Sequence, residues 1–306
     1  LKPPSILMTT IESFALLMSE KSSTNLFKNV KFVIIDEIHS FINTKRGELL
    51  SLNLARLNKI SKNHKKIMLS ATIKDCNDAS RYFCYKKAFI IFAETQKKIK
   101  VKILSENNDI PWSGYSPLYS IDKIYNKIEN NICIIFVNTR AQAELLFQNL
   151  WKINKKNLKI AIHHGSLEKK IRIKVENKMV SGELDCIIAT SSLDLGIDWS
   201  NVNLIIQIGA PKGISRLIQR IGRSNHFVDG VPMAYLVPTN KFEFLECFAA
   251  IEAIKENDFE KIIRRRGSID VLAQHIMGIA CSGGFNPKVL FSNIKESWPY
   301  RNLSNS

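Results

Sequence analysis

The sequence predicts an α/β fold with two tandem parallel-sheet domains, the first of them incomplete, followed by the start of an α-rich module. Short apolar runs alternate with amphipathic helical stretches, which is the order expected of parallel sheets. Two such series occur, and a polar stretch containing Asn, Pro and Gly separates them. The 306 residues exceed the roughly 100–200 residues of one average domain, so two domains and part of a third fit the length.

The first predicted domain covers residues 1–95. We expect three strands in it, at 5–10, 32–35 and 66–72, and two helices, at 11–18 and 47–60. The chain opens with Leu1, and no element precedes the first expected strand. A truncated first domain is therefore expected.

The second predicted domain covers residues 121–242 and follows a linker or hairpin at 96–120. Its strands are expected at 132–137, 159–162, 185–190, 204–208 and 233–237. Its helices are expected at 141–151, 168–180 and 215–221. Residues 243–306 form the third module, with helices expected at 244–255 and 270–281.

The composition is that of a globular protein with a polyanionic partner. The apolar fraction is 45% and the charged fraction 24%, which argues against disorder. No apolar stretch approaches the roughly 20 residues that span a bilayer, and no signal-peptide layout is present, so we expect a cytoplasmic protein.

The charge is strongly positive: Lys and Arg number 44 against 28 Asp and Glu, and the net charge of +16 favours nucleic acid as a partner. The alternative is that the lysines only decorate solvated faces. The six cysteines form no C-x-x-C pair, so reduced thiols are expected.

Two adjacent carboxylates follow the apolar run at 32–35. Asp36 and Glu37 would lie at the carboxyl end of a buried strand, where open α/β sheets place ligand-binding groups. One carboxylate can hold Mg²⁺ through water, and the next can orient an attacking water. The alternative is an ordinary surface turn after the strand.

The matching positive charge lies about 180 residues later, in the run from Gln219 to Arg223. Arg220 and Arg223 are spaced i and i+3 and share a helix face, so both can point at a triphosphate. An exposed basic helix is the alternative.

Polar residues end most of the other predicted strands. Ser70 and Thr72 can contact Glu37 or His39 across neighbouring strand ends, although a Ser/Thr pair at a strand end is usually just the cap of the next helix. Thr9 and Thr10, and likewise Thr139 and Arg140, have two interpretations. They either cap the helix that follows or bind a phosphate of a nucleic-acid backbone.

Two longer runs are more informative. His163 and His164 point in opposite directions on a strand, which disfavours a metal site and favours a loop facing nucleic acid. The run 189–198 delivers three hydroxyls, including that of Ser191, and then a bend at Gly196 before Asp198. Such a loop can contact both a phosphate and a nucleotide, which would couple two sites.

In this order the motifs resemble those of a superfamily 2 helicase: DEIH at 36–39, SAT at 70–72, FVNTR at 136–140, ATSSLDLGID at 189–198 and QRIGR at 219–223. Finer features are similar to the large helicase-related (Lhr) family: TKRG at 44–47, HHGSL at 163–167 and QRIGRSNH at 219–226. The runs 270–276 and 298–301 resemble the start of the winged-helix domain of that family. The resemblance implies two RecA-like domains and ATP and Mg²⁺ as cofactors.

The resemblance also implies a role for each motif residue. Asp36 would hold Mg²⁺ through water, Glu37 would activate the hydrolytic water, Arg223 would be the arginine finger, and Arg220 would contact the γ-phosphate. The remaining nucleotide contacts would be His39, Ser70, Thr72, Gly196, Asp198 and Gln219. The tracking strand would contact Thr9, Thr10, Thr139, Arg140, His164 and Ser191.

The chain departs from the family pattern in three places. No G-x-x-x-x-G-K-[ST] loop occurs, so the cradle for the β- and γ-phosphates is missing. Ile11 stands where the family has a proline in its strand-binding loop, and His226 replaces a basic residue, which favours the Lhr-like over the Ski-like assignment.

The resemblance therefore implies a fragment of an Lhr-like, ATP-dependent DNA helicase or translocase, moving 3′ to 5′ in DNA repair and unable to hydrolyse ATP alone. Single-stranded DNA is the expected partner. The alternatives are an RNA-directed or Ski-like helicase, and a basic nucleic-acid-binding module without motor activity.

Overall fold

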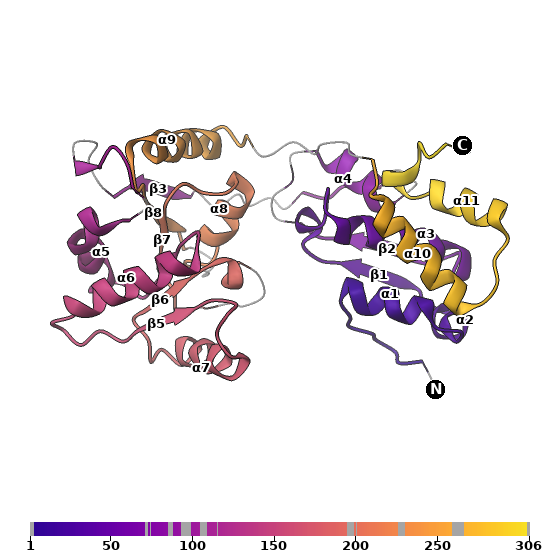
Figure 1. The fold of residues 1–306 in the computed structure, drawn as a ribbon, viewed down its shortest axis with the longest axis horizontal. Coiled ribbons are helices and arrows are strands. Elements are labelled where there is room, and N and C mark those ends of the chain that lie inside the picture. The colour runs from indigo at the N-terminus through magenta and orange to yellow at the C-terminus, as the bar shows by residue number, and fades with distance from the viewer. Residues whose placement is uncertain are drawn as a thin grey trace. The chain divides into compact units, whose positions relative to one another are not determined.

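The chain forms two compact units in the computed structural model (Figure 1). The structure describes residues 3–70, 73, 75–84, 88–92, 99–104, 109–114, 116–194, 199, 201–225, 230–258 and 266–304. Unit 1 comprises Leu1–Phe92 and Lys261–Ser306, and unit 2 comprises Ala93–Glu260. Unit 1 is thus assembled from both ends of the chain, and unit 2 is continuous in sequence.

Unit 1 combines a two-stranded parallel sheet with helices from both of its segments. The N-terminal segment contains α1 (Ile11–Ser19), α2 (Ser23–Phe27), β1 (Phe32–Ile35), η1 (Ile38–Ser40), α3 (Lys45–Ile60), β2 (Lys65–Met68) and α4 (Cys76–Phe83). The C-terminal segment contains α10 (Ile269–Ser282), α11 (Pro287–Lys295) and η5 (Trp298–Tyr300).

Capping residues set where the helices of unit 1 begin. The Thr10 side chain accepts a hydrogen bond from Ser13 N at the start of α1, and Thr44 accepts one from Gly47 N at the start of α3. Gly47 is required by a close approach, since a Cβ there would lie 2.0 Å from the Phe41 carbonyl oxygen.

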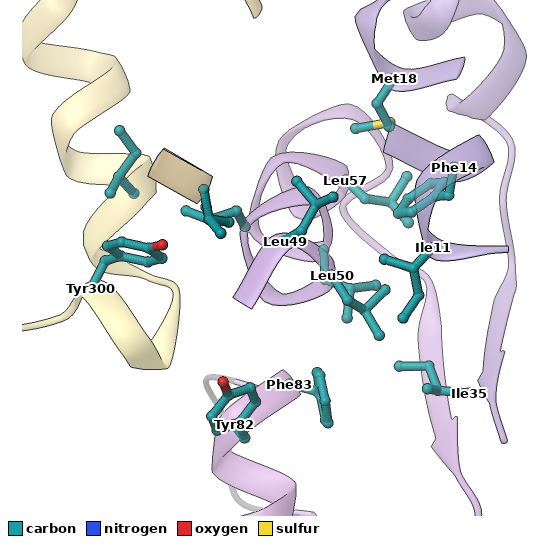
Figure 2. Close-up of a cluster of buried hydrophobic side chains, with 14 of the residues drawn as sticks. Ile11, Phe14, Met18, Ile35, Leu49, Leu50, Leu57, Tyr82, Phe83 and Tyr300 are labelled. Carbon is teal, nitrogen blue, oxygen red and sulfur yellow. The ribbon is translucent and has the colours of Figure 1, made fainter. Parts of the chain in front are cut away.

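The core of unit 1 is shared by the two segments. Figure 2 shows Ile11 and Phe14 of α1 facing the same cluster as Leu49 and Leu57 of α3. Tyr300, from the C-terminal segment, is buried in that cluster, and its hydroxyl donates to the Ser268 carbonyl over 2.8 Å. The C-terminal segment therefore completes the core of unit 1.

The outer face of the β1–β2 sheet is apolar and exposed. Phe32 and Ile34 on β1 alternate with inward-facing Val33 and Ile35, as the pleat dictates. Ile67 is exposed on the same sheet. Parallel sheets are normally covered on both faces, whereas the described residues leave this face exposed.

Unit 2 is a six-stranded parallel sheet with helices on both faces. Its elements are β3 (Lys100–Ile103), η3 (Leu118–Ser120), α5 (Ile121–Ile128), β4 (Cys133–Phe136), α6 (Arg140–Lys152), β5 (Ile160–His163), α7 (Lys169–Val180), β6 (Cys186–Ala189), η4 (Ser191–Leu193), β7 (Leu204–Ile208), α8 (Ile214–Ile221), β8 (Met233–Val237) and α9 (Lys241–Lys255).

The strand order is β3-β8-β7-β4-β6-β5, with every pair parallel. Residues of β4 alternate between two cores: Cys133 and Ile135 pack with α5 and α6, and Ile134 and Phe136 pack with α8 and α9. Every residue of β4, β6 and β7 is buried, as expected for central parallel strands.

Most of the predicted elements are confirmed within one or two residues at each end, but the prediction of a strand at 5–10 was wrong. Residues 5–10 pair with no strand that the structure describes, and Ile6 and Met8 are exposed, so the expected first strand is absent there. The segment at 96–120, which was expected to be a linker or hairpin, contains β3, which forms the sheet edge beside β8. Its alternation of Lys and aliphatic residues is the pattern of an edge strand.

The units also divide the chain differently from the predicted domains. Helix α9, assigned to the third module from about residue 243, contributes Cys247 and Ala250 to the core of unit 2. Helices α10 and α11 pack on unit 1 instead.

Candidate functional site: strand ends in both units

Asp36 and Glu37 lie at the carboxyl end of β1, as the sequence predicted. Glu37 adopts a left-handed conformation, with φ 51° and ψ 45°, which is unusual for a residue with a side chain. Its backbone N–H donates to Asp36 Oδ1 over 2.9 Å, and Ser40 Oγ donates to its carbonyl over 2.8 Å. These local bonds hold the turn that presents both carboxylates.

His39 connects the two strand ends of unit 1. Its Nδ1 lies 2.7 Å from Ser70 Oγ, and its Nε2 lies 3.3 Å from Glu37 Oε2. The predicted contact of Ser70 with His39 is therefore present. The pairing of β1 with β2 explains it, since Leu69 N donates to Ile35 O and Ile38 N donates to Leu69 O. Thr72 lies outside the described residues.

Thr9 and Thr10 lie on the exposed segment before α1. Thr10 acts as the cap described above, and Thr9 Oγ1 lies 3.3 Å from the Thr10 carbonyl. A phosphate contact by either hydroxyl stays a prediction.

The polar residues after β4, β5 and β6 gather at one edge of unit 2, because all three strands are parallel. Thr139 caps α6 in a capping box with Gln142. Arg140 is exposed, and its Nη1 donates to Ser166 Oγ over 3.1 Å. Ser191 is exposed at the start of η4, and His164 is buried with Nε2 3.6 Å from Glu144 Oε1. The structure thus brings these four predicted strand contacts to a common edge.

Arg220 is held inside unit 2. It is 3% exposed, its Nε and Nη2 donate to the two carboxylate oxygens of Asp194 over 2.7 and 3.3 Å, and its Nη1 donates to Gln207 Oε1 over 2.6 Å. The guanidinium also lies 4.5 Å from the centroid of the Phe136 ring. These contacts engage the side chain within its own unit, and its predicted γ-phosphate contact stays a prediction.

Arg223 and Gln219 lie beside it, half-buried at the end of α8. Arg223 Nη2 donates to the Asp194 carbonyl over 3.0 Å. The Asp194 carboxylate also lies 3.4 Å from Arg216 Nε, so this one residue contacts three arginines of the α8 region. Gly196 and Asp198 lie outside the described residues.

The predicted ATP site has one half in each unit. Asp36 and Glu37 belong to unit 1, and Arg220 and Arg223 belong to unit 2. Their mutual approach across a nucleotide stays a prediction.

The carboxylates fit a hydrated magnesium ion better than a metal bound by protein alone. Mg²⁺ commonly takes one or two carboxylates and keeps water or substrate phosphates as its other ligands. In the described part of the chain no three His, Cys, Asp or Glu side chains cluster as a metal cage would require.

Among the residues that the structure describes, no helix is long and apolar enough to cross a membrane.

Sequence reasoning missed two buried polar clusters. Asp194 stands within the motif at 189–198, where the sequence pattern points only to the hydroxyl side chains, Gly196 and Asp198. His163 bridges Ser192 Oγ and Glu176 Oε1, both at 2.8 Å. Burial lowers the pKa of His163, and the neighbouring Glu176 acts in the opposite direction. The two hydrogen bonds of the imidazole join η4 to α7. Long-range partners such as Glu176 leave no local signal in a sequence.

Comparison with known proteins identifies three family models along the chain. Residues 1–79 match the DEAD/DEAH box helicase model, residues 116–227 the helicase conserved C-terminal domain, and residues 252–306 the winged helix domain of large helicase-related protein. Their order confirms the predicted fold class.

The ATP-dependent helicase Lhr-Core of Methanocaldococcus jannaschii is 34% identical over 99% of this chain and 36% of its own length. The Lhr helicase/uracil glycosylase of Escherichia coli is 27% identical over 98% of this chain and 23% of its own length. The chain thus spans about a third or less of these curated relatives.

Among solved structures, the Mycobacterium smegmatis helicase Lhr bound to ssDNA and AMP-PNP has a TM-score of 0.87 and 29% identity, over 99% of this chain and 40% of that one. The DUF1998 helicase MrfA bound to DNA has a TM-score of 0.69 and 15% identity, over 92% of this chain and 41% of that one. The second likeness concerns the fold alone.

Proposed function

Because this chain belongs to the family of large helicase-related (Lhr) proteins, which are ATP-dependent helicases, we propose that it is part of a motor that moves along single-stranded DNA. The relative of known structure binds ssDNA and a nucleotide analogue, and the net charge of +16 suits a polyanion. We further propose 3′ to 5′ movement, a role in DNA repair and a cytoplasmic location.

One observation carries the assignment: the left-handed turn at Glu37, with His39 bonded to Ser70 on the neighbouring strand end. Bound Mg-ATP would supply the scissile phosphate bond and the cation. Asp36 would hold the ion through water, and Glu37 would orient the attacking water. His39 joins Glu37 to Ser70, so the carboxylate and the second strand end are positioned together.

We also propose that these 306 residues do not hydrolyse ATP by themselves. The sequence has no phosphate-binding loop, so its backbone donors and lysine are missing. The apolar face formed by Phe32, Ile34 and Ile67 is exposed, and a parallel sheet is usually covered there by a further layer. This exposure supports the proposal that the first domain is incomplete in these 306 residues.

Two measurements test the proposal. The chain should bind single-stranded DNA with an affinity that falls steeply with salt, and should show no DNA-stimulated ATP hydrolysis above background. Robust turnover by the 306 residues would refute the second part. In a longer form carrying a phosphate-binding loop, Glu37→Gln should abolish hydrolysis and keep DNA binding.

The rival functions give different results in the same assays. An RNA-directed helicase should prefer RNA over DNA of matched length and sequence. A binding module without motor activity should keep its function after Glu37→Gln in the longer form. Partial duplexes with one 3′ or one 5′ tail report the direction of movement, and the damage sensitivity of a strain lacking the gene reports the repair role.

A further inference from the structure

An anchored loop in unit 2 presents a tryptophan to solvent. The loop covers residues 109–114 and follows β3. The Pro111 carbonyl accepts from Lys241 N over 3.0 Å, and the Gly114 carbonyl accepts from Asn240 Nδ2 over 2.9 Å. These bonds bracket Trp112 on both sides, and Ile110 is buried beside it. The backbone around the indole is thus tied to the segment that follows β8.

Trp112 is 71% exposed although its backbone is held in place. Tryptophan side chains are highly buried on average, so an exposed indole on a backbone that is held by hydrogen bonds is unusual. Lys241 Nζ lies over its ring, 4.2 Å from the ring centroid. A flat π surface with a cation beside it is the combination with which proteins bind the bases and phosphates of a single strand.

The tryptophan lies at the sheet edge that also carries the predicted strand contacts. Strands β3, β8, β7 and β4 are all parallel, so the loop after β3, the segment after β8 and the residues after β4 are at one edge. Asn138, after β4, donates to the Ala210 carbonyl after β7 over 3.0 Å, which ties neighbouring strand ends together. Strand β8 lies two strands from β4, about 10 Å at the usual strand spacing. About three nucleotides at about 3.4 Å each cover that distance.

We propose that Trp112 is a stacking platform for one base of a bound single strand, with Lys241 beside the adjoining phosphate. The proposal rests on the proposed function, since it assumes that unit 2 binds single-stranded nucleic acid at this edge. It adds a contact outside the helicase motifs and extends the path of the strand from Thr139 and Arg140 towards β8.

The chain provides a matched control. Trp151 is also exposed, at 58%, and stacks on Phe147 with ring centroids 5.6 Å apart. It lies near the end of α6, which starts at the carboxyl edge with Arg140 and runs for 13 residues, about 20 Å. Trp151 therefore lies towards the opposite edge of the sheet.

The test measures binding of fluorescent oligo(dT) and oligo(U) to the whole chain by anisotropy. Loss of one base stack should weaken binding about 5- to 150-fold in Trp112→Ala, while Trp112→Phe stays close to the unchanged chain. Trp151→Ala should bind as the unchanged chain does. Because stacking releases no counterions, Trp112→Ala should leave the salt slope unchanged, whereas Arg140→Ala should reduce it by about one.

Circular dichroism must first show that each variant is folded. If the unchanged chain binds neither oligonucleotide, the proposed function itself fails. If it binds and Trp112→Ala binds equally well, or Trp151→Ala weakens binding as much, the stacking role is overturned and the proposed function stands. A change in self-association with Trp112→Ala, without a change in oligonucleotide binding, would overturn it in favour of a protein contact.

Discussion

Replacing Asp194 by Asn should sharply destabilise unit 2. The Asp194 carboxylate is the only acidic partner that the described residues give to the Arg220 guanidinium, which is 3% exposed. Asparagine keeps the volume and one hydrogen-bond acceptor but removes the charge. Leaving one member of a buried pair without its partner costs about 3–5 kcal/mol. Gln207 and Phe136 still contact Arg220, so we expect the lower end, about 3 kcal/mol.

The measurement is urea unfolding followed by far-ultraviolet circular dichroism. A loss of about 3 kcal/mol is a large part of the 5–15 kcal/mol that stabilises a typical domain, so the midpoint shift should be unmistakable. Asp109→Asn is the matched control. It removes the same charge from an ion pair with Lys123 at 2.6 Å, but both side chains are about half exposed, and the cost should stay below about 1 kcal/mol.

A double variant separates lost charge balance from lost packing. If the destabilisation comes from a buried unpaired charge, Asp194→Leu combined with Arg220→Met should be more stable than Asp194→Leu alone. Equal losses in Asp194→Asn and Asp109→Asn, or simple additivity in the double variant, would refute this account of Asp194.

Three further outcomes are expected. Thr139→Ala should cost about 1 kcal/mol in urea unfolding, because it removes the capping box of α6; no loss would mean that the box is not formed. Burial lowers the pKa of His275 from 6.5 to about 4, with a smaller contribution from Arg56. Protonation therefore favours the unfolded state, so unit 1 should be fully stabilised above about pH 6.5 and lose up to about 3 kcal/mol as the pH falls towards 4. Hydrogen exchange of the α10 amides at about pH 7 and about pH 5 measures this loss of stability. If His275→Leu lost as much stability between these two pH values as the unchanged chain, this account of His275 would be contradicted. Tyr300→Ala should cost about 3–5 kcal/mol and expose residues 266–304 to limited proteolysis, whereas resistance equal to the unchanged chain would argue against the docked C-terminal segment.

Local patterns predicted the elements that carry their own signal. The strands at 32–35 and 233–237 were predicted with their observed bounds, because continuous apolar runs mark parallel strands, although Phe32 and Ile34 are exposed. β3 was missed, because it is short and stands in a Lys-rich stretch that leads into Asn, Pro and Gly residues, and its partner strand β8 is about 130 residues away. The contact of His39 with Ser70 followed from strand order, since parallel strand ends share an edge.

The arrangement around Arg220 was beyond such reasoning. An arginine in a helicase-like motif predicts a phosphate contact, but its burial against Asp194 and Gln207 depends on the packing of β7, η4 and α8. Likewise, the periodicity of α9 predicts a helix but does not say which core it joins.

The two-segment construction of unit 1 has a consequence for how the chain is made. A ribosome synthesises α1 and α3 early, but Tyr300, which is buried in their core, emerges roughly 200 residues after Phe92. At about 5–20 residues per second, that interval is roughly 10–40 s. Unit 2 is continuous in sequence and can fold within that interval. Until the C-terminal segment emerges, the surface of the unit 1 core that this segment covers stays exposed on the nascent chain.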